Sequence, residues 1–148
     1  MRIKKQGGTM KGNYVTKWID GMAFETEING HTVVMDATEK FGGKDRGPRP
    51  KPLLIAALTG CTGMDVTSIL KKMKVIYDSF EIDTETDMTD DHPKTYTKMH
   101  LIYKFQGNDL PLKKIEKAVK LSQEKYCGVV ALLEKGLELT YTIELNKN

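Results

Sequence analysis

Residues 48–74 constrain the fold more strongly than any other stretch of the chain. Pro48, Pro50 and Pro52 hold the backbone extended, because a residue that precedes proline avoids the α region. Pro52 can itself occupy the first turn of a helix, where its missing N–H costs nothing. Residues 53–58 are apolar on every face, which predicts burial all round. A narrower apolar stripe then continues at three- and four-residue spacing: Val66, Ile69, Leu70 and Met73. A central helix over 52–73 follows.

Cys61 lies in the middle of this predicted helix, flanked by Gly60 and Gly63. Each glycine inside a helix costs about 1 kcal/mol relative to alanine. A helix that keeps two glycines despite this cost is expected to need the space that they leave. We therefore predict that another part of the structure approaches the helix closely at Cys61. Burial among neighbouring side chains and the carboxylate of Asp65, four residues on, would both raise the pKa of the thiol. The neighbours expected to bury it are Leu54, Ala57, Leu58 and Met64.

The segments around the helix carry the alternation of β-strands. Residues 12–37 predict a three-stranded sheet, because Asp20-Gly21 and Asn29-Gly30 are hairpin turn signals between alternating runs. Residues 39–51 predict a loop. Residues 75–146 predict strand, strand, helix and strand, with strands over 75–86, 94–105 and 137–145. A helix is predicted between the last two strands, beginning at Pro111 with Asn108-Asp109 as its cap and ending near Gly128. Its buried stripe is expected to be Leu112, Ile115, Ala118, Val119 and Ser122. A short helical piece over 129–135 follows it.

This order predicts an α+β chain in one domain, residues 1–148. A net charge of +3 is too small to indicate a nucleic-acid partner. The pattern predicts neither a membrane span nor a signal peptide, so we expect a cytoplasmic protein. In that compartment Cys61 and Cys127 are not expected to form a permanent structural disulfide, which leaves redox chemistry or core packing open. The polar residues 87–93 are interpreted as a solvated turn, with no metal site and no cofactor.

The motifs resemble those of the OsmC/Ohr family, the osmotically inducible and organic hydroperoxide resistance proteins. The resemblance rests on Gly-Pro-Arg-Pro at 47–50, Leu-Leu at 53–54, Gly-Cys-Thr-Gly-Met-Asp at 60–65 and Tyr-Cys-Gly-Val at 126–129. The order of elements and the separation of the cysteines also fit. The segment around Cys61 is similar to a less-characterised OsmC-like subgroup.

The resemblance implies an OsmC-like fold in which antiparallel sheets wrap around two long central helices in an intertwined homodimer. It also implies thiol-dependent reduction of organic hydroperoxides. In that mechanism Cys61 attacks the distal peroxide oxygen and becomes a sulfenic acid. Cys127 then closes a reversible disulfide, and a dithiol reductant such as a lipoylated protein restores both thiols.

The sequence departs from the family at the residues that activate the nucleophile. The efficient peroxidases of the family use an arginine held by a glutamate, and here Lys51 stands at the glutamate position. Lys40 is the nearest cation to the family's arginine position. Arg46 and Arg49 on the loop are the remaining candidates for thiolate activation or substrate binding, and we expect Arg49 to contribute most.

Two functions therefore remain open. The first is a reductase of organic hydroperoxides that uses Cys61 and Cys127. The second is a non-enzymatic protein of the stress response that binds a small apolar ligand and has lost the activating pair. Cys127, expected at the N-terminus of the last helical piece, would feel the helix dipole, which suits a resolving thiol; its alternative role is core packing.

Overall fold

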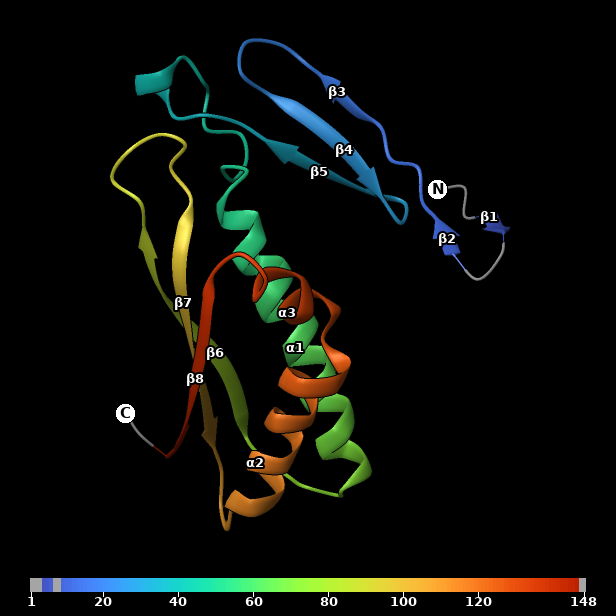
Figure 1. Ribbon diagram of the computed structural model, residues 1–148, viewed down its shortest axis with the longest axis vertical. Helices are drawn as coiled ribbons and strands as arrows, with labels where there is room; N and C mark the ends of the chain where they lie inside the picture. The colour runs from blue at the N-terminus through green and yellow to red at the C-terminus, as the bar shows by residue number, and fades with distance from the viewer. Residues whose placement is uncertain (1–3, 7–8, 147–148) are drawn as a thin grey trace. The chain divides into compact units, whose positions relative to one another are not determined.

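A computed structural model describes residues 4–6 and 9–146 (Figure 1). These residues divide into two compact units, the first ending at Leu54 and the second beginning at Ile55. The α+β class predicted from the sequence is confirmed by the order of helices and strands. The single domain stays a prediction, so each unit is described by itself.

The first unit contains a two-stranded and a three-stranded antiparallel sheet. The second sheet has the order β3-β4-β5, formed by Thr16–Trp18, Phe24–Ile28 and His31–Met35. Positive φ angles at Gly21, Asn29 and Gly30 mark the predicted hairpin turns. The hairpin of β1 (Lys4–Gln6) and β2 (Thr9–Lys11) was not predicted, because strands so short carry no hydrophobic alternation.

The loop that leads to the helix is ordered by close backbone approach. It contains the short 3-10 helix η1, Glu39–Phe41. A Cβ atom at Gly43 would lie 1.9 Å from the carbonyl oxygen of Ala37, and one at Gly47 would lie 2.1 Å from that of Val34. Only glycine fits at these two positions, because any side chain would overlap the backbone beside it.

The second unit packs helices on one face of a three-stranded sheet with the order β6-β7-β8 (Figure 1). The strands are β6 (Ser79–Met88), β7 (Tyr96–Gln106) and β8 (Glu138–Leu145). The helices are α1 (Pro52–Lys72), α2 (Leu112–Leu121) and α3 (Gly128–Leu133), and a π-helical turn, η2 (Ser122–Tyr126), joins the last two. The bounds of α1 therefore differ by only one residue from those of the predicted central helix over 52–73.

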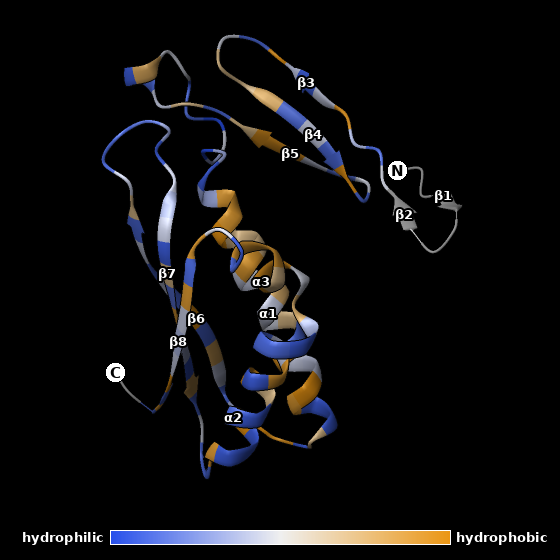
Figure 2. Cartoon of the chain, viewed as in Figure 1, coloured by the Kyte–Doolittle hydropathy of each residue, from blue (hydrophilic) through white to orange (hydrophobic). Residues whose placement is uncertain are grey.

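The core lies between these helices and the sheet. Alternate residues of β7 are fully buried, together with one face of α1 and one face of α2. They include Met99, Leu101, Tyr103 and Phe105 from β7, Leu58, Val66 and Leu70 from α1, and Ile115, Ala118 and Val119 from α2. Figure 2 shows the result on α2, which is mostly hydrophilic outside this stripe.

The first half of α1 is less covered than predicted. Within residues 53–58 only Leu58 is buried, and Leu54 is 45% exposed. α1 is long enough and apolar enough to cross a membrane, but the core helix of a soluble protein can meet the same two criteria. The burial of Leu58, Val66 and Leu70 in the hydrophobic core identifies it as a core helix.

Three finer expectations are wrong. The pairing of β7 with β8 is parallel, not antiparallel. Alternation does not encode direction, and the long connection through α2 and α3 permits a parallel return. Asn108-Asp109 do not cap α2; Pro111 stands at the cap without a side-chain bond, and Asp109 has a φ of 50°. Leu112, assigned to the buried stripe, is 46% exposed.

Candidate active site

The fold brings the two cysteines together from elements far apart in sequence. Cys61 lies on α1 and is half-buried, whereas Cys127 precedes α3 and is 3% exposed. Their sulfur atoms and one carboxylate oxygen of Asp65 all lie within 4.8 Å of one another. Both cysteines are free thiols. A reversible disulfide between them is geometrically within reach, and their catalytic roles stay predictions.

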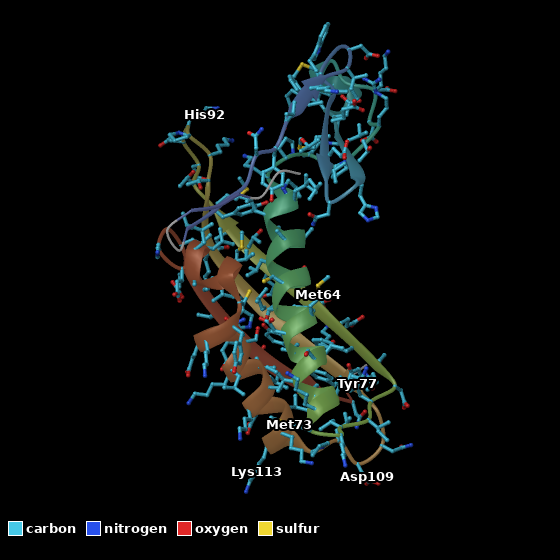
Figure 3. All side chains as sticks on the ribbon, turned by 90° about the vertical axis from the view of Figure 1, so that its right-hand side faces the viewer. Met64, Met73, Tyr77, His92, Asp109 and Lys113 are labelled. Carbon is cyan, nitrogen blue, oxygen red and sulfur yellow. The ribbon has the colours of Figure 1, made fainter. Side chains whose placement is uncertain are left out.

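The expected burial of Cys61 is only partly present. Leu58 is fully buried, but Leu54 is 45% exposed and Met64 is 76% exposed. Figure 3 shows Met64 extending outward from α1. Cys61 packs against the buried core to which Leu58 belongs, so the predicted enclosure of the thiol is incomplete within one chain.

The electrostatic setting of Cys127 also differs from the expectation. Its sulfur stands at the N-cap of α3 and accepts the N–H of Val130 at 3.4 Å. The pKa of the Cys127 thiol is nevertheless raised to about 11, chiefly by burial and also by the adjacent Cys61 sulfur, against the opposing N–H of Val130. Burial therefore outweighs the helix terminus, and Cys127 is a protonated thiol at neutral pH.

Asp65 connects the sulfurs to a chain of buried hydroxyl groups. Ser122 Oγ donates to Asp65 Oδ2 at 3.1 Å, and Thr62 Oγ1 lies 2.8 Å from Ser122 Oγ. Thr62 Oγ1 also lies 2.7 Å from Tyr103 Oη, to which Gln123 Nε2 donates at 2.6 Å. Thr62, Tyr103 and Ser122 are each 0% exposed.

The number of hydrogens available gives this series of hydrogen bonds a single direction. Each hydroxyl carries one hydrogen, and that of Ser122 is given to Asp65. Thr62 must then donate to Ser122, and Tyr103 must donate to Thr62. The donors thus run from Gln123 through three hydroxyls to the Asp65 carboxylate. Burial raises the pKa of Tyr103, so this phenol stays protonated.

Sequence reasoning missed these hydroxyl residues as part of a site. The available signal was polarity at core positions: Thr62 is a buried polar residue of α1, and Ser122 was placed in the buried stripe of α2 without a partner. A buried hydroxyl requires a hydrogen-bond partner, so such positions predict a network.

The predicted cations are engaged by groups of the first unit. Arg49 donates to the carbonyl oxygens of Gly47 and Asp36 at 2.6 and 3.3 Å and forms an ion pair with Asp45. The Lys40 ammonium lies 5.7 Å from the ring centroid of Phe41, and Lys51 is exposed. Because Cys61 belongs to the second unit, the roles given to these residues stay predictions.

Arg46 is held by two carboxylates. Its Nη2 lies 2.6 Å from Asp20 Oδ1, and its Nε lies 3.0 Å from Asp36 Oδ2. Asp36 is 2% exposed and also accepts the backbone N–H groups of Ala37, Lys44 and Arg46. These donors hold the pKa of Asp36 at about 2 despite its burial. Arg46 therefore has a structural task in the loop.

The two glycines that flank Cys61 border a groove, which neither cysteine lines. Gly60 has no atom within 4 Å of an added Cβ, and at Gly63 such a Cβ would lie 3.5 Å from Ile82. Both glycines line a groove between α1 and β6, together with Thr59, Thr67, Phe80 and Ile82. Another part of the chain does approach the helix at Cys61 itself, whose sulfur lies within 4.8 Å of that of Cys127, but not at the glycines, which border this groove.

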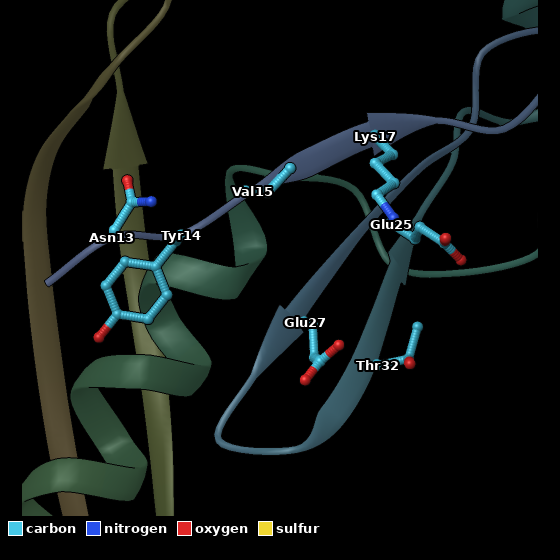
Figure 4. Close-up of a pocket in the computed structure, with 7 residues that line it drawn as sticks. All are labelled: Asn13, Tyr14, Val15, Lys17, Glu25, Glu27 and Thr32. Atoms are coloured by element: carbon cyan, nitrogen blue, oxygen red, sulfur yellow. The ribbon is translucent and has the colours of Figure 1, made fainter. Parts of the chain in front are cut away.

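A second hollow, of about 310 Å³, lies in the first unit (Figure 4). Lys17, Glu25 and Glu27 are among its lining residues. Neither cysteine and none of the four predicted cations lines it, so it has no part in the site described above.

Cys61, Asp65 and Cys127 form the one group of three or more His, Cys, Asp or Glu side chains that lie close together within the described ranges. Ser122 is the hydrogen-bond partner of the carboxylate in this group.

A cysteine pair between a long central helix and a short helical piece, over a three-stranded sheet, defines an α+β protein with a dithiol site. The family described as OsmC-like protein matches residues 42–142, and the chain belongs to this family.

Several known proteins are similar over nearly their whole length. Protein YhfA of Escherichia coli (strain K12) is 32% identical over 130 residues, which are 87% of this chain and 94% of that protein. A hypothetical protein from Aquifex aeolicus VF5 is 26% identical with a TM-score of 0.76, and the match covers 91% of this chain and 97% of that one. The organic hydroperoxide resistance protein OhrB of Bacillus subtilis, at 15% identity and a TM-score of 0.61 over 90% and 96% of the two chains, shares the fold.

Proposed function

We propose that this protein is a cytoplasmic, thiol-dependent reductase of organic hydroperoxides that acts through Cys61 and Cys127. The observation that carries the proposal is the position of the two free sulfurs within 4.8 Å of each other in one chain. Membership of the OsmC-like family supports it. A disulfide needs its sulfurs about 2.05 Å apart, a distance that modest side-chain movement can close.

The exposure of the two thiols supports an order for them in the reaction. Cys61 is half-buried, so a hydroperoxide can reach it, and its thiolate attacks the distal oxygen with loss of the alcohol. Cys127 is buried and protonated, which suits the second, resolving thiol. It displaces hydroxide from the Cys61 sulfenic acid and forms the disulfide. A dithiol reductant, such as a lipoylated protein, then returns both residues to thiols.

The activating cation belongs to the proposal as well. Arg49 remains our main candidate, with Arg46, Lys51 and Lys40 as alternatives. The substrate would be an organic hydroperoxide with an apolar body. Its body could lie in the groove lined by Phe80 and Ile82, which borders Gly60 next to Cys61 but does not include Cys61 itself. The same groove would suit another small apolar ligand.

A homodimer is also part of the proposal. Only 22% of the most apolar window of α1 is buried, which leaves an apolar helix face that a second copy would cover. Sedimentation at micromolar concentration should give about twice the chain mass. A folded monomer under these conditions would contradict the dimer.

The decisive experiment measures the two thiols during reaction with cumene hydroperoxide. One equivalent should consume both thiols and give an intramolecular disulfide between Cys61 and Cys127 on peptide mapping. Cys61→Ser should abolish peroxide consumption, whereas Cys127→Ser should consume one equivalent and stop at an oxidised Cys61. Thiols that survive excess peroxide in the wild-type protein would refute the proposal.

One observation favours the second candidate function, a non-enzymatic ligand-binding or stress-response protein. Arg46 and Arg49 are both engaged by carboxylates of their own loop and its neighbours, and Lys51 replaces the expected carboxylate. If the thiols resist peroxide while the protein binds an apolar fluorescent probe, this second function is the better description.

A further inference from the structure

The proposed cycle contains a step for which the buried thiol needs assistance. Cys127 must lose its proton to attack the sulfenic acid on Cys61, because the thiolate is the nucleophile. The side chain is 3% exposed, so bulk water cannot readily take the proton. The N–H of Val130 at its sulfur is a donor and cannot accept a proton. A base close to both sulfurs is required.

Asp65 is placed to act as this base. It lies four residues after Cys61 on α1, a spacing that puts both side chains on the same face of a helix. One of its carboxylate oxygens lies within 4.8 Å of both sulfur atoms. Tyr103, the nearest other titratable group of the network, is a phenol that must donate its hydrogen to Thr62 and therefore cannot serve as the base.

The carboxylate is both held in place and connected to solvent. Ser122 donates to its Oδ2, and behind Ser122 the buried hydroxyls of Thr62 and Tyr103 fix the direction of donation. A carboxylate has about four acceptor positions, so this bond leaves capacity for a thiol proton. Asp65 is half-buried and lines a hollow of about 460 Å³ that also includes Lys72, Lys117 and Tyr126.

We propose that Asp65 is the proton-transfer residue of the disulfide-forming step. This inference rests on the proposed function. The Asp65 carboxylate removes the proton from Cys127 Sγ as this sulfur attacks Cys61 Sγ. The S–O bond of the sulfenic acid breaks, and Asp65 gives the proton to the departing hydroxide. The products are one disulfide, one water and the regenerated carboxylate, so no further reactant is required.

The test follows two steps separately in the variant Asp65→Asn. Asparagine keeps an oxygen that can accept from Ser122 but removes the base. Rapid quenching with a sulfenic acid reagent measures oxidation of Cys61, and free-thiol counting with peptide mapping measures disulfide closure. Loss of general acid–base catalysis slows a step by about 10²–10⁴-fold. We therefore expect closure to slow by at least about 10²-fold, with Cys61 sulfenic acid accumulating.

The pH profile separates a proton-transfer role from a purely structural one. Without the base, closure must depend on the ionised Cys127 thiol, so its rate should rise about tenfold per pH unit from pH 6 to 9. The wild-type rate should be much flatter. The titratable and charged groups around Asp65 are Cys61 and Cys127 at the sulfur site and Lys72, Lys117 and Tyr126 in the hollow that it lines. Asp65→Glu, which keeps a carboxylate, should restore most of the closure rate.

Glu116→Gln is the matched control, because Glu116 is an exposed carboxylate on the neighbouring helix α2. It should close the disulfide at the wild-type rate. If Asp65→Asn fails to fold, Ser122→Ala takes its place, and misplacement of the carboxylate should slow closure by about tenfold. Closure at the wild-type rate in the folded variant would overturn the inference. If peroxide consumes neither thiol of the wild-type protein, the proposed function itself has failed.

Discussion

Replacing Thr62 by valine tests the buried hydroxyl network most directly. Valine has nearly the same shape and is β-branched like threonine, so packing and helix propensity change little. The hydroxyl that disappears makes two bonds, at 2.7 Å to Tyr103 and at 2.8 Å to Ser122. The substitution therefore isolates the polar contribution at a site that is 0% exposed.

The expected loss of stability follows from what each partner retains. Ser122 still donates to Asp65 and loses one donor, at a net cost of about 1 kcal/mol. Tyr103 still accepts from Gln123, but its own hydrogen has no acceptor left, and a stranded buried donor costs about 1–3 kcal/mol. The new methyl group offsets part of this. We expect Thr62→Val to lower the free energy of unfolding by about 2–3 kcal/mol.

Urea unfolding of the reduced protein, followed by circular dichroism at one fixed protomer concentration, measures this change. Thr67→Val is the matched control, because Thr67 is exposed on the same helix, and it should change stability by less than about 0.5 kcal/mol. Adding Tyr103→Phe to Thr62→Val should cost little, since phenylalanine removes the stranded donor. Equal stabilities for Thr62→Val and Thr67→Val, or strictly additive effects in the double variant, would refute the network.

Two further predictions follow from the shifted pKa values. Iodoacetamide at pH 8 should alkylate Cys61 at least about tenfold faster than Cys127, because Cys127 is buried and its pKa is about 11; equal rates on peptide mapping would contradict this assignment. The pKa of Asp36 falls from 3.8 to about 2 on folding, so its carboxylate stabilises the fold above pH 4, and this contribution is lost as the pH falls toward 2. The difference in melting temperature between wild type and Asp36→Asn should therefore shrink on acidification, and a difference that is constant with pH would count against it.

Most of the fold could be predicted because its signals are local. The prolines and apolar period of residues 52–73 predict the long helix, and it forms over Pro52–Lys72. Alternation predicts strands, and those over 94–105 and 137–145 form within two residues of the expected bounds. The parallel direction of β8 could not be predicted, because side-chain alternation is the same in either direction. The extent to which the side chains of α1 are buried likewise depends on how the elements pack together, which no local sequence pattern encodes.

The site could be predicted only as far as the motifs extend. The cysteine motifs pointed to Cys61 and Cys127, and Asp65 was recognised as a carboxylate one helical turn from Cys61. The partners of Thr62 lie 41 and 60 residues away along the chain, on β7 and on the π-helical turn. No local pattern connects these positions. The sequence also predicted a helix-dipole effect at Cys127 without the burial that opposes it.

The π-helical turn η2 explains how the site is assembled. It begins at Ser122, whose hydroxyl reaches Asp65, and it includes Gln123, whose amide reaches Tyr103. It ends directly before Cys127, whose N–H donates to the carbonyl oxygen of Ser122 at 2.9 Å. One irregular turn therefore positions both Ser122, which holds the carboxylate, and Cys127, the proposed resolving thiol. π-Bulges frequently occur at functional sites. If the turn tightened into a regular helix, Cys127 would rotate relative to Ser122, so Ser122 Oγ could not keep its bond to Asp65 while Cys127 Sγ stayed beside Cys61. The position of the proposed resolving thiol and the hydrogen bond that holds its proposed base thus depend on the same backbone feature.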